Sequence, residues 1–465
     1  MNIDLELLSI QNPWWTSLGS RRNISKNLKS DLEFEISDNE KLRWQPEILT
    51  ELSLKRGDIS ILRGARGTGK TTILKLLIKK LISKKDVNPD NIFYYSCHNL
   101  DTYEELNELI KIFLNWRKKT KQNFIFIDEI ALIKNWPRGV DYLAKAGKLN
   151  NSAVILSSST LPKKHKELDF VDQDKLISGL DFFEFIKLLN PKLSKKLNKN
   201  NYKKYQAQLD YYLDIYFLTG GFIVCLNDYL KQGAISQTIY NNYLYWLIAD
   251  FAKLDRDIVL LRQILEQVII NLGQPVGYKT IARKTKTKSH LTVAEYLEIL
   301  ESMLSIKMVY QSDKAGKPTS RMAKKVYFRD PFLFWLFYSY IYGSVDSWQF
   351  SRARLHRQDV FNCLIENIVF SHLIKQETLN NWGQYITYWR DNIKKKEINF
   401  LVHKTKKTIP IIIDYEPGKK DAKEKIFKLA GFREGIIISH NTLGLKGSIK
   451  TMPLTYFLLF YKDLL

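Results

Sequence analysis

The chain has few cysteines. Only Cys97, Cys225 and Cys363 occur among its 465 residues, and they are widely separated. A disulfide framework needs several cysteines, and a zinc site needs ligands at short spacing, so the sequence supports neither. Sparse cysteine is typical of a reducing compartment, and we therefore expect a cytoplasmic protein.

The chain also lacks a long hydrophobic run. Its most apolar stretch, residues 331–342, is only about a dozen residues long, whereas a transmembrane helix needs about 20. This stretch therefore predicts a buried element, and we expect no membrane span. The N-terminus, M-N-I-D-L-E-L-L, has acidic residues and no basic region before an apolar core, so no signal peptide is expected.

Acidic residues are outnumbered by basic ones. The chain has 49 Asp and Glu against 72 Lys and Arg, which gives a formal net charge of +23. Such a charge attracts polyanions, with nucleic acid as the first candidate and an anionic membrane surface as the second. The alternative is a compositional bias toward lysine and asparagine that produces only a solvated basic surface. The hydrophobic content of 45% is ordinary for a globular protein, and the length predicts about three domains.

A phosphate-binding motif begins at residue 64. An apolar run over residues 59–62 predicts a strand, the segment G-A-R-G-T-G-K-T follows, and residues 73–81 predict a helix. Strand, G-x-x-x-x-G-K-[ST] and helix in this order are typical of a P-loop, in which backbone N–H groups and the helix N-terminus surround phosphate oxygens. We expect Lys70 to contact the β- and γ-phosphates of ATP and the Thr71 hydroxyl to bind Mg²⁺. The expected nucleotide-binding residues are Gly64, Ala65, Arg66, Gly67, Thr68, Gly69, Lys70, Thr71 and Thr72.

Strands and helices alternate after the P-loop. Residues 92–96, 123–127 and 153–156 predict strands and residues 103–116 a helix, which indicates a parallel sheet covered on both faces. Asp128 and Glu129 follow the third strand, at the sheet edge where such folds bind ligands. We expect Asp128 to hold Mg²⁺ and Glu129 to polarise the attacking water. Ser157 or Ser159, after the fourth strand, would contact the γ-phosphate or position the water, unless these hydroxyls only end the strand.

The middle of the chain predicts helices and one hairpin. Residues 180–189 predict a helix that closes the ATPase core, and the helices around residues 219–221 (T-G-G) predict a small lid. Helices over residues 257–272, 278–284 and 292–306, followed by strands over residues 308–310 and 325–328, form a winged helix-turn-helix pattern. Lysines before the third helix and in the hairpin loop suit phosphate contacts, although many winged helices bind proteins instead. The expected nucleic-acid contacts are Lys284, Lys286, Lys288, Lys314 and Lys317.

The chain resembles the prokaryotic AAA-like ATPases, often called archaeal ATPases, that carry a winged helix and a C-terminal restriction-endonuclease-like domain. The shared features are N-P-W-W at residues 12–15, the P-loop, Ile127-Asp128-Glu129, Asn135-Trp136, the serines after residues 154–156, F-E-F at 183–185 and T-G-G at 219–221. The resemblance implies an α/β fold: a P-loop NTPase (AAA-like) parallel sheet with a helical lid, a winged helix-turn-helix and a PD-(D/E)xK-like α/β domain. The expected domains are an N-terminal arm (1–50), the ATPase core (51–190), the lid (191–255), the winged helix (256–332) and the nuclease-like domain (333–465). We expect the tryptophans of N-P-W-W to anchor the arm on the main body.

Two departures from the family pattern bear on activity. The nuclease-like domain has Asn399, Ile412 and Asp414 where the family has an acidic residue and Glu-x-Lys. Only Glu366, with Asp414 or Glu416, could still bind a metal, so we expect the fold without cleavage, the alternative being a shifted site. The family also commonly has an arginine between the fourth strand and F-E-F, but residues 161–179 contain none. Slow or partner-dependent hydrolysis follows, unless Arg66, Arg138 or a neighbouring subunit supplies the charge.

These patterns together predict an ATP-driven switch that uses ATP and Mg²⁺. Its basic C-terminal half would bind DNA or a protein partner, and a homo-oligomer is a further possibility. The alternative is a non-hydrolysing scaffold held together by nucleotide, and a third hypothesis is an ATP-dependent nuclease.

Overall fold

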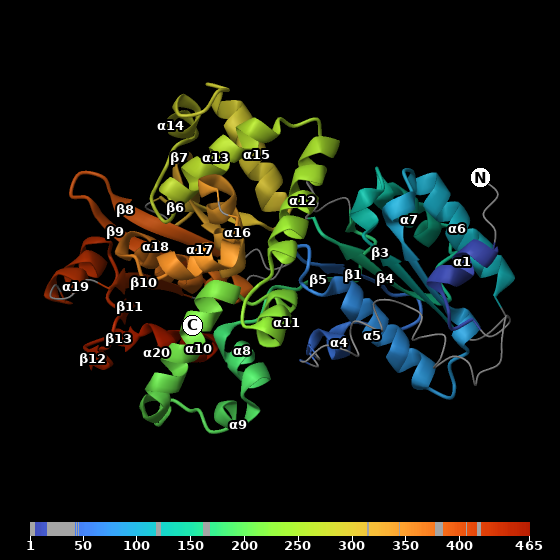
Figure 1. Ribbon diagram of the computed structural model, residues 1–465, viewed down its shortest axis with the longest axis horizontal. Coiled ribbons are helices and arrows are strands. Elements are labelled where there is room, and N and C mark those ends of the chain that lie inside the picture. Colours follow the sequence, from blue (N-terminus) through green and yellow to red (C-terminus); the bar gives the residue numbers. More distant parts are fainter. Residues whose placement is uncertain are drawn as a thin grey trace. The chain divides into compact units, whose positions relative to one another are not determined.

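The computed structural model describes residues 5–15, 42, 44, 46–117, 122–160, 168–313, 316–343, 345–376, 385–405, 407–415 and 420–465. The chain divides into two compact units, residues 1–177 and 178–465, and each has its own sheet (Figure 1). Lys314 and Glu416 lie outside the described residues, as does most of the predicted N-terminal arm.

The first unit is built on a five-stranded parallel sheet with the order β2-β3-β4-β1-β5. The strands are β1 (Ile59–Arg63), β2 (Ile92–Ser96), β3 (Asn123–Asp128), β4 (Ser152–Ser158) and β5 (Gln173–Leu176). The helices are α1 (Leu5–Gln11), α4 (Ile48–Glu51), α5 (Lys70–Ser83), α6 (Tyr103–Trp116) and α7 (Trp136–Lys145). The predicted α/β arrangement is confirmed here. Strand β5 was not predicted, because its residues Q-D-K-L are half-buried and form no apolar run.

The second unit contains an eight-stranded mixed sheet with the order β12-β13-β11-β10-β9-β8-β6-β7. Its strands are β6 (Ile306–Ser312), β7 (Pro318–Phe328), β8 (Tyr385–Asp391), β9 (Lys396–His403), β10 (Thr408–Asp414), β11 (Gly435–Ser439), β12 (Gly444–Lys446) and β13 (Ile449–Pro453). Its N-terminal helices are α8 (Phe182–Leu189), α9 (Pro191–Ser194), α10 (Gln206–Thr219), α11 (Ile223–Gln232), α12 (Gln237–Lys253), α13 (Ile258–Ile270), α14 (Tyr278–Arg283) and α15 (His290–Ser302). The remaining helices are α16 (Pro331–Tyr342), α17 (Ser347–Arg354), α18 (Gln358–Leu373), α19 (Lys420–Leu429) and α20 (Leu454–Leu464).

Two elements group differently from the prediction. Helix α8, expected to close the ATPase core, belongs to the second unit, because its N-cap Asp181 binds Lys462 and Tyr461 of α20. The hairpin β6–β7, expected as a separate wing, is one edge of the eight-stranded sheet, because β6 also pairs in parallel with β8. The remaining finer boundaries, and the role of α9 to α12 as a lid, stay predictions.

The most apolar stretch of the sequence forms a buried helix. This helix, α16, coincides with residues 331–342, and most of its side chains are buried, as predicted. In the described parts of the chain, no single helix is both long and apolar enough to cross a membrane, and only the bent pair Tyr202–Thr219 and Ile223–Gln232 reaches that length jointly.

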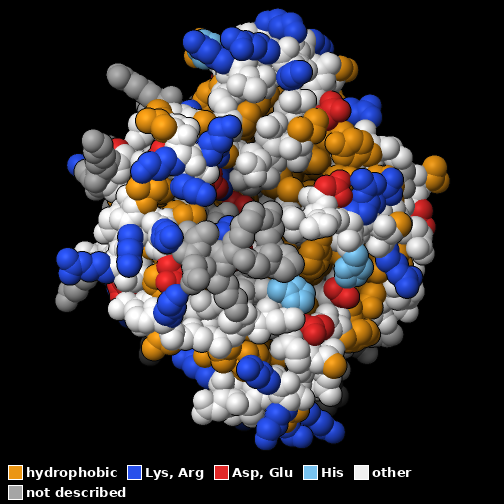
Figure 2. All heavy atoms as spheres, turned by 90° about the vertical axis from the view of Figure 1, so that its left-hand side faces the viewer, with side chains coloured by type: hydrophobic (Ala, Val, Ile, Leu, Met, Phe, Trp, Pro, Cys, Tyr) orange, Lys and Arg blue, Asp and Glu red, His pale blue; other side chains and the backbone are white. Residues whose placement is uncertain are grey.

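Basic side chains are prominent on the second unit. Figure 2 shows one face of the molecule, on which Lys and Arg side chains are widely spread and Asp and Glu side chains are fewer. A group of Lys and Arg side chains gathers at the top of this view, at the height where Figure 1 places α14.

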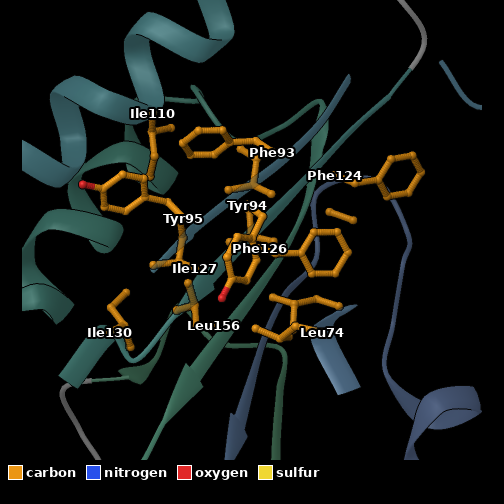
Figure 3. Packing of buried hydrophobic residues seen from close by; sticks show 14 of the residues in the cluster. Leu74, Phe93, Tyr94, Tyr95, Ile110, Phe124, Phe126, Ile127, Ile130 and Leu156 are labelled. Carbon is orange, nitrogen blue, oxygen red and sulfur yellow. The ribbon is translucent and has the colours of Figure 1, made fainter. Parts of the chain in front are cut away.

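The core of the first unit is formed by its buried strands and the helices packed against them. Figure 3 shows Phe93 and Tyr95 of β2 near Ile110 of α6, and Tyr94 of β2 near Phe126 of β3. Strands β1, β3 and β4 are buried along their whole length, as expected for parallel strands with both faces covered. The same core also contains Trp14 and Trp15, whose exposed fractions are 0% and 3%. The prediction that these tryptophans anchor the N-terminal arm is therefore confirmed.

Candidate active site

The glycines of the P-loop are required by its backbone. Gly67 and Gly69 have φ angles of 72° and 93°, a region that L-residues with a side chain rarely adopt. Gly64 is limited by space, because a Cβ there would lie 2.4 Å from the side chain of Ile177. A Cβ on Gly69 would lie 2.6 Å from the ring of Trp44, so this ring packs against the loop. The loop is therefore a tight turn that carries its N–H groups toward the start of α5.

The predicted lysine begins the helix that follows the loop. Lys70 is the first residue of α5, and it is 4% exposed. Its Nζ donates to the carbonyls of Gly64 and Ala65 at 3.1 and 3.3 Å, and it lies 3.5 Å from Oε1 of Glu129. The ammonium group therefore sits inside the loop with a carboxylate beside it, where a phosphate group would find a positive charge.

Asp128 and Thr71 lie together at the end of β3. The Thr71 hydroxyl donates to Oδ2 of Asp128 at 2.7 Å, and the backbone N–H of Glu129 donates to Oδ1 at 3.1 Å. The Ser157 hydroxyl also donates to Oδ1. Asp128 is only 2% exposed, so these donors compensate much of the cost of burying a carboxylate.

Glu129 is held by a different serine. Its Oε2 accepts a hydrogen bond from Ser159 at 2.8 Å, while its backbone N–H donates to the Ser157 hydroxyl at 3.0 Å. Its φ of 53° is unusual for a residue with a side chain, and such backbone strain is often found at functional sites. Burial alone would raise the pKa of Glu129, but Lys70, Arg66 and the Ser159 hydroxyl lower the pKa below its ordinary value. The carboxylate is therefore ionised and able to accept a hydrogen bond from water.

The two serines thus contact different carboxylates. The sequence left open whether Ser157 or Ser159 acts, and the structure places Ser157 against Asp128 and Ser159 against Glu129.

The oxygen groups near the P-loop suit Mg²⁺. A magnesium ion bound with a nucleotide uses one or two protein oxygens together with phosphate oxygens and water. The Thr71 hydroxyl and the Asp128 carboxylate supply such hard oxygen ligands side by side. Among the described residues, no group of three or more His, Cys, Asp or Glu could hold a metal ion by itself.

The arginines near this site differ in their surroundings. Arg66 lies in the P-loop, close enough to Glu129 to lower the pKa of that carboxyl group. Arg138 is exposed on α7, where its guanidinium lies 5.7 Å from the ring centre of Tyr103. It lines a surface cleft of about 540 Å³ between α6 and α7. Of these two arginines, Arg66 is therefore the one near the Glu129 carboxylate.

The candidate nucleic-acid residues lie in two places. Lys284, Lys286 and Lys288 are exposed in the connection between α14 and α15, and Lys317 is exposed in the turn of the β6–β7 hairpin. Lys286 pairs with Asp257, and Lys288 donates to the carbonyl of Arg283 at 3.1 Å.

The three positions that depart from the expected nuclease pattern have different surroundings. The Asn399 side chain accepts the backbone N–H of Ile413 at 3.0 Å, so its amide stabilises the sheet. Ile412 is 1% exposed within an apolar core. Asp414 lies 3.5 Å from Nζ of Lys423.

A buried lysine occupies the space between the remaining carboxylates. Lys325 of β7 is fully buried, and its Nζ lies 2.9 Å from Oε1 of Glu366 and 2.5 Å from Oε1 of Glu397. Tyr327 donates to Glu366 at 2.5 Å, and Arg390 donates to Glu397 at 3.0 Å. Burial would lower the pKa of Lys325, but the two carboxylates raise it, so its ammonium group stays charged.

The sequence did not identify Tyr94 as a hydrogen-bond partner of the Asp128 carboxylate. Its hydroxyl donates to Oδ2 of Asp128 at 3.0 Å, the same oxygen that Thr71 contacts. The available signal was a tyrosine on the strand that precedes the acidic strand. The sequence has adjacent tyrosines in β2, and only the pairing of β2 with β3 shows that Tyr94 reaches Asp128. The ion pairs of Lys325 were also not predicted, because their carboxylates lie on two distant elements, Glu366 on α18 and Glu397 on β9.

Comparisons with known proteins match two parts of the chain. The family of AAA domains matches residues 56–185, and a domain of unknown function, DUF8612, matches residues 210–337. No curated protein matches the chain.

Three solved structures are similar to parts of this chain at low sequence identity. PCH-2 from C. elegans shares 18% identity at a TM-score of 0.24, over 41% of this chain and 50% of that chain. A STAND protein (signal transduction ATPase with numerous domains) with a tetratricopeptide repeat sensor, from Pyrococcus horikoshii, shares 13% identity at a TM-score of 0.29, over 75% of this chain and 48% of that one. The E. coli HORMA:CdnC:Trip13 complex shares 17% identity at a TM-score of 0.23, over 44% and 69%. This chain thus covers about half the length of the first two.

The AAA-domain match agrees with the site geometry. It covers β1 to β5 and the P-loop, and the sheet it covers is parallel, as a P-loop NTPase requires. Residues 56–185 are therefore similar to an AAA-type P-loop ATPase domain.

Proposed function

We propose that the first unit binds ATP with Mg²⁺ and hydrolyses it slowly, as a molecular switch. One observation carries this proposal: Lys70 of the P-loop lies 3.5 Å from Glu129, and Thr71 lies 2.7 Å from Asp128. Lys70 supplies the positive charge that a bound triphosphate needs, and Thr71 and Asp128 supply oxygens for its metal ion. Glu129 supplies a carboxylate that can accept a hydrogen bond from the attacking water, and all four residues lie at one edge of the sheet.

Each residue has a distinct part in this mechanism. The loop N–H groups and Lys70 bind the phosphates, and Mg²⁺ held by Thr71 and Asp128 would neutralise charge on the phosphate oxygens. Glu129 accepts a hydrogen bond from the attacking water and orients it toward the γ-phosphorus. A bond forms between the water oxygen and the γ-phosphorus as the bond from that phosphorus to the bridging oxygen of ADP breaks, so ADP and inorganic phosphate leave, and the proton lost by the water passes to phosphate or solvent. Ser159 keeps the Glu129 carboxylate in place through its 2.8 Å hydrogen bond.

We expect slow hydrolysis because the supply of positive charge is limited. Arg66 is the arginine near Glu129, and residues 161–179 contain no arginine in the sequence. An arginine that stabilises the γ-phosphate in the transition state accelerates such reactions by about 10³ to 10⁵. A second subunit or a protein partner that supplies one would therefore stimulate the reaction.

Two variants test the proposal. Binding of mant-ATP to the wild type and to Lys70→Ala tests recognition, and equal affinities would refute it. Glu129→Gln keeps the size of the side chain but removes the carboxylate, so we expect nucleotide binding to persist and the turnover number to fall by about 100-fold or more. Equal and very slow turnover in wild type and Glu129→Gln would favour the alternative, a non-hydrolysing scaffold.

We also propose that the second unit has a nuclease-like fold without cleavage activity. The support is the buried ammonium group of Lys325, which already neutralises Glu366 and Glu397, together with Ile412 at a position where a carboxylate would be needed. Plasmid DNA with Mg²⁺ or Mn²⁺ is the test, and cleavage that disappears in Glu366→Gln would contradict the proposal.

We infer from its basic surface that the second unit binds DNA. The observation is the exposure of Lys284, Lys286 and Lys288 in one short connection. If these lysines contact phosphates, replacing all three by alanine should flatten the slope of log affinity against log salt by about 2.7, or about 0.9 for each contact. An unchanged slope would show that DNA binds elsewhere, and no binding at low salt would favour a protein partner.

A further inference from the structure

The outer edge of the sheet in the first unit is covered by side chains. Strand β2 is an edge strand, and such a strand exposes backbone groups that would otherwise pair with another chain. Residues 11–15, here called the N-terminal clip, satisfy these groups. The clip contains no strand: Gln11 is the last residue of helix α1, and residues 12–15 form a turn.

The hydrogen bonds of the clip follow the edge of β2. Asn12 holds both backbone groups of Tyr94: its Oδ1 accepts the N–H at 2.7 Å, and its Nδ2 donates to the carbonyl at 2.9 Å. On either side, Gln11 accepts the N–H of Ser96 at 2.8 Å, and Trp14 donates to the carbonyl of Ile92 at 3.0 Å. Trp15 donates to the same carbonyl at 2.9 Å. The clip is therefore centred on Tyr94.

Tyr94 connects this edge to the candidate magnesium site. Its hydroxyl donates to Oδ2 of Asp128 at 3.0 Å, next to the 2.7 Å hydrogen bond from Thr71. Its ring lies 3.8 Å from Nζ of Lys75, and the same Nζ lies 5.6 Å from the ring of Trp14. Tyr94 thus binds the clip through its backbone N–H and carbonyl and contacts Asp128 through its side chain.

We propose that Tyr94 is a positioning residue for Asp128 and that docking of the N-terminal clip sets how well the site accepts Mg²⁺ with nucleotide. This inference rests on the proposed function of the P-loop site. A hydrogen bond to one carboxylate oxygen fixes the direction of the carboxylate, and losing such an outer partner typically lowers metal affinity by about 10-fold to 100-fold. A factor that pulled the clip away from β2 would release Tyr94 and weaken the site.

The experiment compares nucleotide affinity with and without metal. Mant-ADP is titrated into the full chain in EDTA and in Mg²⁺, and the ratio of the two affinities is the gain due to magnesium. We expect Tyr94→Phe to reduce this gain by about 10-fold, at the lower end of the range for outer partners of a metal ligand. Tyr95→Phe is the matched control, since Tyr95 is adjacent on β2 and packs against Phe93, 6.4 Å between ring centres.

A double-mutant cycle tests whether the clip acts through Tyr94. Asn12→Ala removes the hydrogen bonds to the backbone of Tyr94, so we expect it to reduce the magnesium gain in the wild-type background. In the Tyr94→Phe background it should change the gain by less than about twofold, because coupled residues do not add. A thermal unfolding curve for each variant shows whether it is folded.

Three results would overturn the inference. The first is an unchanged gain in Tyr94→Phe, and the second is an equal effect of Asn12→Ala in both backgrounds. The third is a wild type that binds mant-ADP in a Lys70-dependent way without any gain from Mg²⁺, which would leave nucleotide binding intact. Nucleotide binding that is absent altogether, or unchanged in Lys70→Ala, would instead remove the proposed function together with the inference.

Discussion

Replacing Lys325 by methionine perturbs the charge cluster of the second unit in a defined way. Methionine fills a similar volume but leaves the carboxylates of Glu366 and Glu397 without the ammonium group between them, at 2.9 and 2.5 Å. The question is whether this ion pair stabilises the fold or is only tolerated by it.

The structure gives the size of the expected effect. Removing one partner of a buried ion pair typically costs about 3 to 5 kcal/mol, and we place this case near the lower end, at about 3 kcal/mol. The reason is that Glu366 keeps the Tyr327 hydroxyl, and Glu397 keeps Arg390 at 3.0 Å. The side chains of the two glutamates are also 13% and 20% exposed, so water relieves part of the cost.

Urea unfolding followed by tryptophan fluorescence measures this change. For an m-value of about 3 kcal/mol per molar, a loss of about 3 kcal/mol lowers the midpoint by about 1 M. Calorimetry on the same variants identifies which transition moves, because two units need not unfold together. Lys199→Met is the matched control, since Lys199 forms an exposed pair with Asp463 at 3.0 Å and should cost less than about 1 kcal/mol.

A second substitution separates charge from packing. In Lys325→Met combined with Glu366→Gln, one orphaned charge is gone, so we expect at least about 1 kcal/mol to be recovered. A Lys325→Met protein as stable as the wild type would refute the reasoning, as would a double variant less stable than the single one.

Three further predictions concern the P-loop, acid stability and a buried thiol. Gly64→Ala should weaken mant-ATP binding by at least about 10-fold, or about 1.4 kcal/mol, because the new Cβ would lie 2.4 Å from Ile177 and force the loop to move. Burial lowers the pKa of His372 to about 3, and burial raises the pKa of Asp330 to about 6. Between about pH 6.5 and about pH 4.5, the unfolded chain takes up a proton at His372 and the folded protein does not, so this residue should lower the free energy of unfolding by about 2.7 kcal/mol. Below about pH 6, the folded protein takes up a proton at Asp330 before the unfolded chain does, which should return about 2 kcal/mol. These two effects nearly cancel in the wild type, whereas His372→Gln keeps only the second and should become more stable on acidification. Cys97 should resist iodoacetamide in the folded protein, because its side chain is buried and burial, with two neighbouring carboxylates, raises the pKa of its thiol.

Each of these predictions has a control. Gly277→Ala, where the nearest atom to the new Cβ would be 3.9 Å away, should leave nucleotide binding unchanged. A His372→Gln protein whose stability does not rise relative to the wild type between about pH 6.5 and about pH 4.5 would contradict the pH argument. Cys363 is less buried than Cys97, and its modification should precede that of Cys97, so the reverse order would be inconsistent with the structure.

Much of the first unit could be predicted from the sequence. Residues 92–96 and 103–116 form the predicted strand and helix, because their apolar and amphipathic patterns are local. Strand β5 gave no such signal, since its polar residues are held by pairing with β1 and by the ion pair of Asp174 with Arg63 at 2.8 Å. In the second unit the hairpin β6–β7 was predicted, but its place in an eight-stranded sheet depends on pairing with β8, more than about 70 residues further along.

The sequence by itself determined the phosphate-binding loop and the acidic end of β3. Both are contiguous motifs in which the order of residues fixes the chemistry, so the linear pattern is enough to identify Lys70, Thr71, Asp128 and Glu129. Only the tertiary structure decided which groups surround them. The assignment of Ser157 and Ser159 to different carboxylates, and the link from Asn12 through Tyr94 to Asp128, depend on the register of neighbouring strands and on a clip 82 residues away in the chain. A linear pattern carries no information about such contacts, because their energy arises only when the strands are packed side by side.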